Sequence, residues 1–344
     1  MLPIDLYAGQ GLRLDQAAAA ASLAETGGFG GLWTLEAATE PFLPLALAAE
    51  HTSRIRLGTA VAVALARNPM VVAHLAHELN RFSGGRLHLG LGTQVGAHIV
   101  ARFGERFDHP ADRMAEFLQA LRAIWACWND EAALDFRGRF YRHTLMTPMF
   151  HPGPSPVGAP RTLISAVGPR MTRVAAEHAD GLVAHPLTSA RYLREVTRPA
   201  LAETPPGFEL VCPVLVITGA DETGVRAARR AVRKQVAFYA STPAYRAVLE
   251  LHGRGPLADR LAALSRQGEW DAMSTVIDDE LLAEFSVEAP VDRLAAALRD
   301  RYRGLLDRVL VYAPYQVPQD VWASAGLAPL EVSPVRSRAS SSLT

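Results

Sequence analysis

The chain alternates between short apolar runs and longer amphipathic stretches, with turn-forming residues between them. The apolar runs contain consecutive Val, Ile and Leu residues, which is typical of parallel strands buried on both faces. The stretches between them have the 3.6-residue periodicity of helices. The expected strands are 4–7, 31–35, 55–63, 86–92, 162–167, 181–185, 208–218 and 307–312, and the expected helices include 14–26, 42–51, 69–82, 111–125, 171–178 and 222–239.

The number of strands predicts the fold class. Eight expected strands, each followed by helix, favour an α/β protein with a closed (β/α)8 barrel of the TIM type, because an open doubly wound sheet usually has fewer strands. We therefore predict a single barrel domain over residues 1–330.

Two segments interrupt this alternation. Residues 128–160 are rich in turn formers and contain an expected hairpin at 134–141, whereas residues 241–285 are helical but supernumerary. Insertions of this length in a barrel usually build the pocket or its cover. Residues 331–344 are rich in serine and have no apolar period, so we expect a disordered tail there.

Composition excludes several classes of partner. Apolar residues make up 49% of the chain, and 35 basic residues balance 35 acidic ones. A neutral chain has no electrostatic attraction to nucleic acid or to an anionic membrane.

The first residues lack the basic and long apolar segments of a signal peptide, so we expect a cytoplasmic protein. Cys127 and Cys212 lack neighbours at metal-ligand spacing, so we expect two small buried residues and no metal site.

The polar residues at the carboxyl ends of the strands are the candidates for chemistry, because a parallel barrel gathers its reactive groups there. These ends contain no HxH or HExxH pair, and the only lysine, Lys234, falls in an expected helix. A Schiff-base aldolase needs an amine inside the barrel, and a metal-dependent hydrolase needs several ligands. A site with few ionisable groups instead suits chemistry that a cofactor performs.

Three strand ends are suited to holding such a cofactor. Residues 56–63 end in small side chains, which let a planar ring approach the backbone but also suit plain barrel packing. Residues 87–93 contain two glycines that would leave backbone amides accessible to an anion, although a GxG pair alone is a weak signal. In residues 165–172 a strand passes through Gly168 to Pro169 and Arg170, which predicts either a phosphate seat or a plain strand-to-helix turn.

Taken in this order, the segments resemble the bacterial luciferase-like monooxygenase superfamily, and more narrowly its branch that uses the deazaflavin coenzyme F420. The resemblance extends over residues 4–315. It rests on the segments 28–33 (GFGGLW), 41–46 (PFLPLA), 56–61 (RLGTAV), 83–92 (SGGRLHLGLG), 136–141 (FRGRFY), 168–171 (GPRM) and 179–182 (ADGL).

The resemblance implies where the cofactor binds. The end of the third strand would form a backbone bulge behind the central ring, in this family often with a non-proline cis peptide. The implied cofactor-binding residues are Thr59, Ala60 and Val61 at the ring, Gly92, Thr93 and Gln94 beside the ribityl chain, and Val167, Gly168, Pro169, Arg170 and Met171 around the phosphate.

The chain departs from the family pattern after the second strand. Many F420-dependent members carry an Asp-His or similar pair there, where this chain reads Thr-Leu-Glu-Ala over residues 34–37. Glu36 is therefore our candidate for the acid or base beside the ring, and His185, at the end of the sixth strand, is the second catalytic candidate. A carboxylate that merely begins a loop and a satisfied loop histidine are the alternatives.

The implied function is F420-dependent hydride transfer to or from a small organic substrate. The alternatives are an FMN-dependent monooxygenase of the same fold and, because the pair is missing, a barrel that binds a cofactor without catalysis. Family members are commonly dimers, so we expect a homodimer. An apolar or mixed substrate is indicated by insertion residues Phe140, Tyr141, Met146, Met149 and Phe150, with Phe238 and Tyr239 beside the second insertion.

Overall fold

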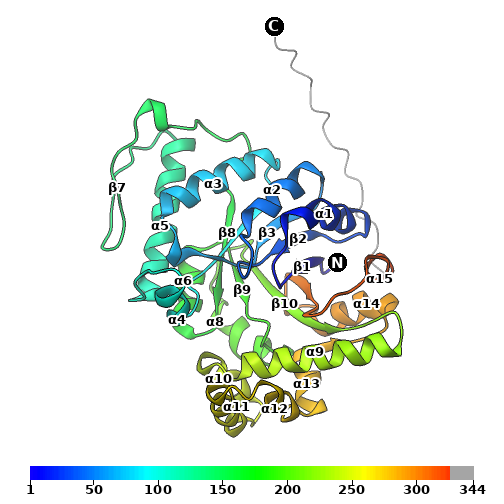
Figure 1. Ribbon diagram of the computed structural model, residues 1–344. Coiled ribbons are helices and arrows are strands. Elements are labelled where there is room, and N and C mark those ends of the chain that lie inside the picture. The colour runs from blue at the N-terminus through cyan, green and yellow to red at the C-terminus, as the bar shows by residue number, and fades with distance from the viewer. Residues whose placement is uncertain (326–344) are drawn as a thin grey trace.

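The computed structural model describes residues 1–325, and the expected tail at 331–344 lies outside them. Within this part of the chain, eight parallel strands close into a barrel in the order β1, β2, β3, β5, β8, β9, β10 and β12, and β12 pairs with β1 (Figure 1). The predicted (β/α)8 barrel is confirmed.

Every strand expected from the sequence is present, with small shifts at the ends. The expected strand 55–63 is present in two parts, β3 and a short continuation, β4. β4 pairs with the end of β5. The barrel strands are β1 Ile4–Ala8, β2 Gly31–Thr34, β3 Arg56–Thr59, β4 Ala62–Val63, β5 Leu87–Gly92, β8 Arg161–Ala166, β9 Gly181–Ala184, β10 Glu209–Ile217 and β12 Arg308–Tyr312.

The helices surround the barrel, and side-chain caps precede two of the longest, α3 and α9. The Asn68 side chain accepts from the Met70 amide over 2.9 Å ahead of α3, and Asp221 accepts from the Gly224 amide over 2.7 Å ahead of α9. The main helices are α1 Ala17–Thr26, α2 Phe42–Glu50, α3 Pro69–Phe82, α4 Gly96–Ala101, α5 Pro110–Asn129, α6 Pro169–His178, α9 Glu222–Ala240 and α14 Val291–Tyr302, with the short α7 Ala190–Tyr192, α8 Arg198–Ala200 and α15 Gln319–Ala323.

The two segments expected to interrupt the barrel contain a hairpin and a group of helices. After α5, β6 Phe136–Arg137 and β7 Arg142–His143 form an antiparallel hairpin on an arm that projects from the barrel (Figure 1). The second insertion consists mainly of α10 Arg246–Leu251, α11 Gly255–Gln267, α12 Trp270–Thr275 and α13 Asp279–Phe285, of which α11, α12 and α13 contact α9. The sequence did not predict β11, Ser286–Glu288, which pairs with the end of β10.

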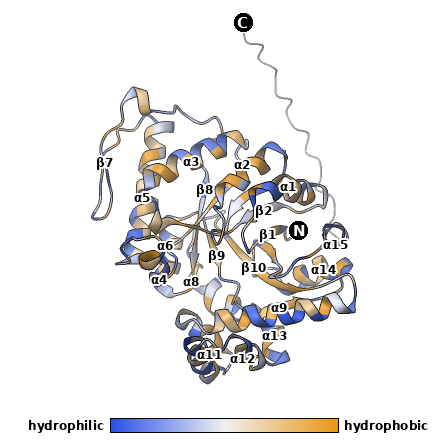
Figure 2. Ribbon diagram, viewed as in Figure 1, coloured by the Kyte–Doolittle hydropathy of each residue, from blue (hydrophilic) through white to orange (hydrophobic). Residues whose placement is uncertain are grey.

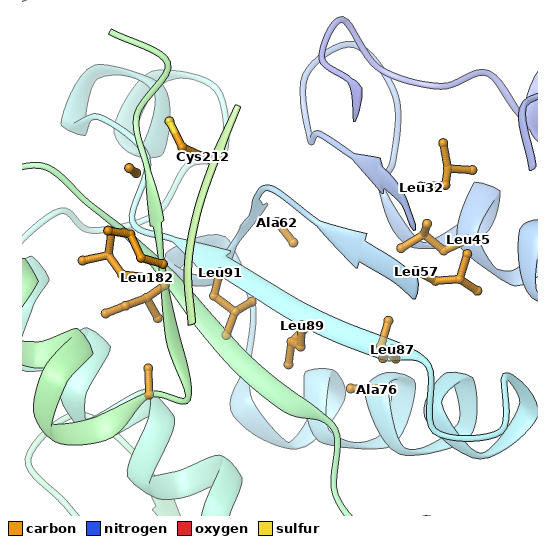
Figure 3. Packing of buried hydrophobic residues seen from close by; sticks show 14 of the residues in the cluster. Leu32, Leu45, Leu57, Ala62, Ala76, Leu87, Leu89, Leu91, Leu182 and Cys212 are labelled. Carbon is orange, nitrogen blue, oxygen red and sulfur yellow. The ribbon is translucent and has the colours of Figure 1, made fainter. Parts of the chain in front are cut away.

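The core has two layers, one between the strands and the helices and one inside the barrel. Leu87, Leu89 and Leu91 project from β5 toward the helix that carries Ala76 (Figure 3). Successive side chains of a strand point to opposite faces, so the alternate residues of β5 face the interior. Figure 2 shows the same division, with apolar strands and helices that carry both apolar and polar residues.

Three further features bear on function. None of the helices in residues 1–325 combines the length and apolar character needed to cross a membrane. The same residues contain no cluster of three or more His, Cys, Asp or Glu side chains suited to a metal ion. Cys127 and Cys212 are both free and buried, as the sequence predicts.

Candidate functional site

A cis peptide bond joins Ala60 to Val61 between β3 and β4. Backbone and side-chain hydrogen bonds from neighbouring strands hold this bond in place. The Ala60 amide donates to the Thr34 carbonyl over 2.7 Å, and the Val61 carbonyl accepts from the Glu36 amide over 3.2 Å. The Tyr7 hydroxyl donates to the Ala60 carbonyl over 2.6 Å. The non-proline cis peptide implied by the resemblance is therefore confirmed, at the carboxyl end of the third strand.

The glycines of β5 allow the cis peptide segment to approach that strand closely. A Cβ atom on Gly90 would lie 1.8 Å from the Thr59 carbonyl oxygen, and one on Gly92 would lie 2.6 Å from Val61 Cγ2. The Thr59 hydroxyl donates to the Gly90 carbonyl and accepts from the Gly90 amide. The Gly90 amide is thus occupied, which corrects the expectation that both glycines offer free amides to an anion.

The residues after β5 lie at the same end of the barrel. Thr93 and Gln94 are half-buried, and Gln94 has a φ of 57°, in the left-handed region. The Gln94 side chain accepts a hydrogen bond from the Val95 amide over 3.0 Å. The proposed contacts of Gly92, Thr93 and Gln94 with a ribityl chain remain a prediction.

The start of α6 is open to solvent at the proposed phosphate seat. Gly168 precedes the helix and Pro169 is its first residue. A Cβ atom on Gly168 would meet nothing within 4 Å. Amides in the first turn of a helix lack intrahelical acceptors, and the helix dipole favours an anion there. The exposed Arg170 guanidinium contacts Asp112 at 3.4 Å, while Val167 and Met171 are half-buried. This arrangement suits a phosphate, whose binding remains a prediction.

The Glu36 carboxylate joins two loops at the carboxyl end of the barrel. Its Oε2 atom accepts from the Val63 amide over 2.7 Å and from Arg67 Nη1 over 2.5 Å. Arg67 also donates to the Val63 carbonyl over 2.9 Å. Glu36 is only 9% exposed. These contacts position the chain that follows the cis peptide, and a role for Glu36 in proton transfer remains a prediction.

His185 is packed against two tyrosines. Its ring stacks on Tyr245 with centroids 3.9 Å apart and meets the edge of Tyr239 at 4.6 Å. Burial lowers the pKa of His185 to about 3. Because Nδ1 accepts from the Leu187 amide over 3.0 Å, the proton of the neutral ring lies on Nε2. His185 can therefore donate a hydrogen bond from Nε2 in its neutral form, and its role in catalysis remains a prediction.

Three tyrosines, Tyr239, Tyr312 and Tyr7, contact one another in turn between His185 and the cis peptide. The Tyr239 and Tyr312 hydroxyl oxygens are 3.3 Å apart, and the Tyr312 ring meets Tyr7 edge-on at 5.2 Å. A Cβ atom on Gly9 would lie within 2.6 Å of both rings, so only glycine fits there. Sequence reasoning did not predict the contacts among these tyrosines, although Tyr7 and Tyr312 lie at the ends of the first and last strands, which a closed barrel makes neighbours.

The apolar residues that the sequence indicated for the substrate pocket are only partly at this group. Tyr239 is a member of it, and Phe238 lies beside Tyr239 with ring centroids 5.8 Å apart. Tyr141 packs instead against Phe117 of α5 at 5.6 Å. Met149 and Phe150 are exposed on the segment that follows the hairpin. The aromatic group therefore draws on α9 and the second insertion.

The chain is similar to known proteins over most of its length. The family model described as luciferase-like monooxygenase matches residues 2–308. An uncharacterized protein of Mycobacterium tuberculosis is 54% identical over 305 residues, covering 87% of this chain and 90% of the relative. A 5,10-methylenetetrahydromethanopterin reductase of Archaeoglobus fulgidus is 26% identical over 304 residues, covering 85% and 87%.

A solved structure also has the same fold. The coenzyme F420 dependent tetrahydromethanopterin reductase from Methanopyrus kandleri superposes with a TM-score of 0.74 at 19% identity, covering 94% of this chain and 97% of that one. At this level of identity the likeness shows the barrel fold.

Proposed function

Because the chain belongs to the luciferase-like monooxygenase family, we propose that it is a coenzyme F420-dependent oxidoreductase that transfers hydride to or from a small organic substrate. The observation that carries the proposal is the carboxyl end of β3, where a hydrogen bond from Tyr7 holds Ala60 and the glycines of β5 let Val61 lie close to that strand. The segments that resemble the F420-dependent branch of the family support the choice of cofactor.

The residues present fit such a cofactor. Val61 is half-buried and is backed by the glycines of β5, so its backbone offers a close surface to a flat ring. The first turn of α6 and Arg170 offer amides and a guanidinium to a phosphate. When bound, F420 would supply hydride chemistry through its deazaflavin ring.

The protein's own residues would orient the reactants and exclude water. Val61 fixes the position of the ring face, and the Glu36–Arg67 ion pair keeps the following chain in place. Correct orientation alone supplies a large part of a rate enhancement. His185 offers a neutral Nε2–H donor at the same end of the barrel.

Cofactor titration tests this proposal. Purified protein is titrated with F420 and, separately, with FMN, while quenching of intrinsic tryptophan fluorescence is followed. We expect saturable binding of F420. The Arg170→Ala variant should bind F420 about 10- to 100-fold more weakly, the effect of one lost charge-assisted hydrogen bond. The Arg173→Ala variant, changed farther along α6, should bind as the wild type does.

The other outcomes of the titration have clear meanings. Binding of FMN together with oxygen uptake would replace the proposal with an FMN-dependent monooxygenase. Binding of neither cofactor would overturn the proposal and leave a barrel without redox function.

We also propose that the protein is a homodimer. Leu43 and Leu47 of α2 and Val71 of α3 are exposed apolar residues on helices that contact each other. Exposed apolar groups on adjoining helices are typical of protein interfaces. Sedimentation velocity should give twice the mass of the chain, and Leu43→Glu with Val71→Glu should give the monomer.

A further inference from the structure

We propose that the hydroxyl pair of Tyr239 and Tyr312 binds a carbonyl or phenolic oxygen of a flat, uncharged substrate. The inference rests on the proposed function and names the substrate class of the same site. It begins from the 3.3 Å separation of the two hydroxyl oxygens. One hydroxyl proton of the pair satisfies their mutual hydrogen bond, and the other is left to donate to a ligand.

The position of the pair favours a ligand at the cofactor site. Tyr312 meets Tyr7 edge-on at 5.2 Å, and the Tyr7 hydroxyl donates to the carbonyl of the cis peptide. The Tyr7 ring therefore connects Tyr312 to the surface that is proposed to hold the cofactor. Tyr312 is 3% exposed, whereas Tyr239 is half-buried, so Tyr239 is the more accessible member of the pair.

The electrostatics of the pair favour an uncharged ligand oxygen. Burial raises the pKa of both Tyr239 and Tyr312 above that of free tyrosine, so both hydroxyls keep their protons at neutral pH. Burial also keeps the neighbouring His185 neutral by lowering its pKa to about 3. A carboxylate ligand would be buried there without a cationic partner, at a large cost in solvation.

The surrounding rings favour a flat ligand. His185 stacks on Tyr245 and meets Tyr239 edge-on, and Tyr7 meets Tyr312 edge-on. Aromatic faces and edges arranged in this way stabilise a further ring through stacked or edge-on contacts. Gly9 preserves the arrangement, because a side chain there would collide with Tyr7 and Tyr312.

The test compares two probes that differ by an oxygen atom. Acetophenone and ethylbenzene have similar shapes, but only acetophenone carries a carbonyl. Dissociation constants are measured by ligand-observed NMR on the full chain without cofactor. We expect the wild type to bind acetophenone more tightly than ethylbenzene. Tyr239→Phe should weaken acetophenone binding about 5- to 10-fold, the loss of one hydrogen bond, and leave ethylbenzene binding unchanged. Tyr312→Phe should weaken acetophenone binding less, because Tyr239 keeps its proton.

Tyr245→Phe is the matched control, because it keeps the ring that stacks on His185 and changes a hydroxyl outside the pair. It should bind both probes as the wild type does. Thermal unfolding of each variant checks that the fold is retained. Equal affinity of the wild type for the two probes, no binding of either, or equal losses for both probes in the pair variants would overturn the inference.

The same variants separate this inference from the proposed function. Tyr239→Phe and Tyr312→Phe should bind F420 as the wild type does, because neither hydroxyl belongs to the proposed ring or phosphate contacts. If F420 fails to bind the wild type while the probes behave as expected, the proposed function fails and the oxygen-binding pair stands. If F420 binds the wild type but the two probes do not behave as expected, the inference about the tyrosine pair fails and the proposed function stands.

Discussion

At the residue scale, the absence of side chains matters as much as their presence. Gly9, Gly90 and Gly92 each face a group that leaves no room for a Cβ atom. In β5 this allows Thr59 and Val61 to lie directly against the strand. In the loop after β1 it allows Tyr7 and Tyr312 to meet. The candidate site therefore depends on close approach of backbone segments.

Gly90→Ala tests this dependence. The added methyl group would lie 1.8 Å from the Thr59 carbonyl oxygen, so β3 and β5 must separate. We expect a loss of about 2–4 kcal/mol in the free energy of unfolding, since overpacking of a core typically costs 1–3 kcal/mol or more. Urea unfolding measures it. Gly224→Ala, where the nearest atom outside the helix lies 3.4 Å away, should remain within about 0.5 kcal/mol of the wild type. Equal stability of the two variants would contradict the argument.

Glu36→Gln distinguishes the two roles considered for this carboxylate. The amide keeps an oxygen for the Val63 N–H but removes the charge that pairs with Arg67. If Glu36 is a positioning residue, F420 binding and thermal stability should both decrease, with a loss of about 1–3 kcal/mol in stability. Stability and F420 affinity equal to the wild type, combined with a loss of kcat alone, would instead indicate proton transfer by Glu36.

Sequence reasoning reached only part of the site at this scale. The resemblance indicated Thr59, Ala60 and Val61 as cofactor-binding residues, because it rests on short runs of small residues that are adjacent in the sequence. The contacts between Tyr7, Tyr312 and Tyr239 escaped prediction, because these residues are far apart in the chain and no periodicity connects them. The occupied Gly90 amide was also missed, since its acceptor, Thr59, lies 31 positions away.

At the scale of elements, a buried ion pair joins three strands at the amino-terminal end of the barrel. Asp5 of β1 is 0% exposed and accepts from Arg308 of β12 at 2.6 and 2.8 Å. The Trp33 indole of β2 donates to the same carboxylate over 2.6 Å. β1 lies between the other two strands in the barrel. These contacts therefore fasten the first and last strands together.

Asp5→Ala should be among the most destabilising single changes in the barrel. It leaves the buried Arg308 guanidinium without its carboxylate, and breaking a buried pair in this way costs about 3–5 kcal/mol. Asp15→Ala removes the exposed partner of Arg13 and should cost less than about 1 kcal/mol. Urea unfolding of both variants checks the difference. A similar, small loss in both would show that the pair contributes little to closure of the barrel.

The elements themselves were largely predictable for a physical reason. A strand buried on both faces must be apolar throughout, and this requirement made the eight barrel strands visible in the sequence. β11 escaped because three residues carry too little pattern. The hairpin was expected at 134–141 and is found at Phe136–His143, because polar residues on an exposed arm do not fix the register.

At the scale of the whole molecule, two histidines, His88 and His185, make stability depend on pH. His88 of β5 accepts from Arg56 over 3.0 Å and lies 3.8 Å from Glu209. Burial, reinforced by the Arg56 charge, lowers the pKa of His88 to about 4. Burial lowers the pKa of His185, which lies at the opposite end of the barrel, to about 3. Both rings are neutral in the folded protein at pH 5, where an unfolded chain would protonate them.

Stability should therefore decrease as the pH falls from about 6.5 to 4. Over this range the unfolded chain binds a proton at His88 that the folded chain does not bind until about pH 4, so acid favours unfolding. With one pKa unit worth about 1.4 kcal/mol, His88 accounts for a loss of about 3 kcal/mol. His88→Gln keeps an acceptor for Arg56 but does not titrate, so its unfolding free energy should fall about 3 kcal/mol less than that of the wild type. Urea unfolding at several pH values between 7 and 4 measures both curves, and parallel curves would mean that His88 is not the source of the acid sensitivity.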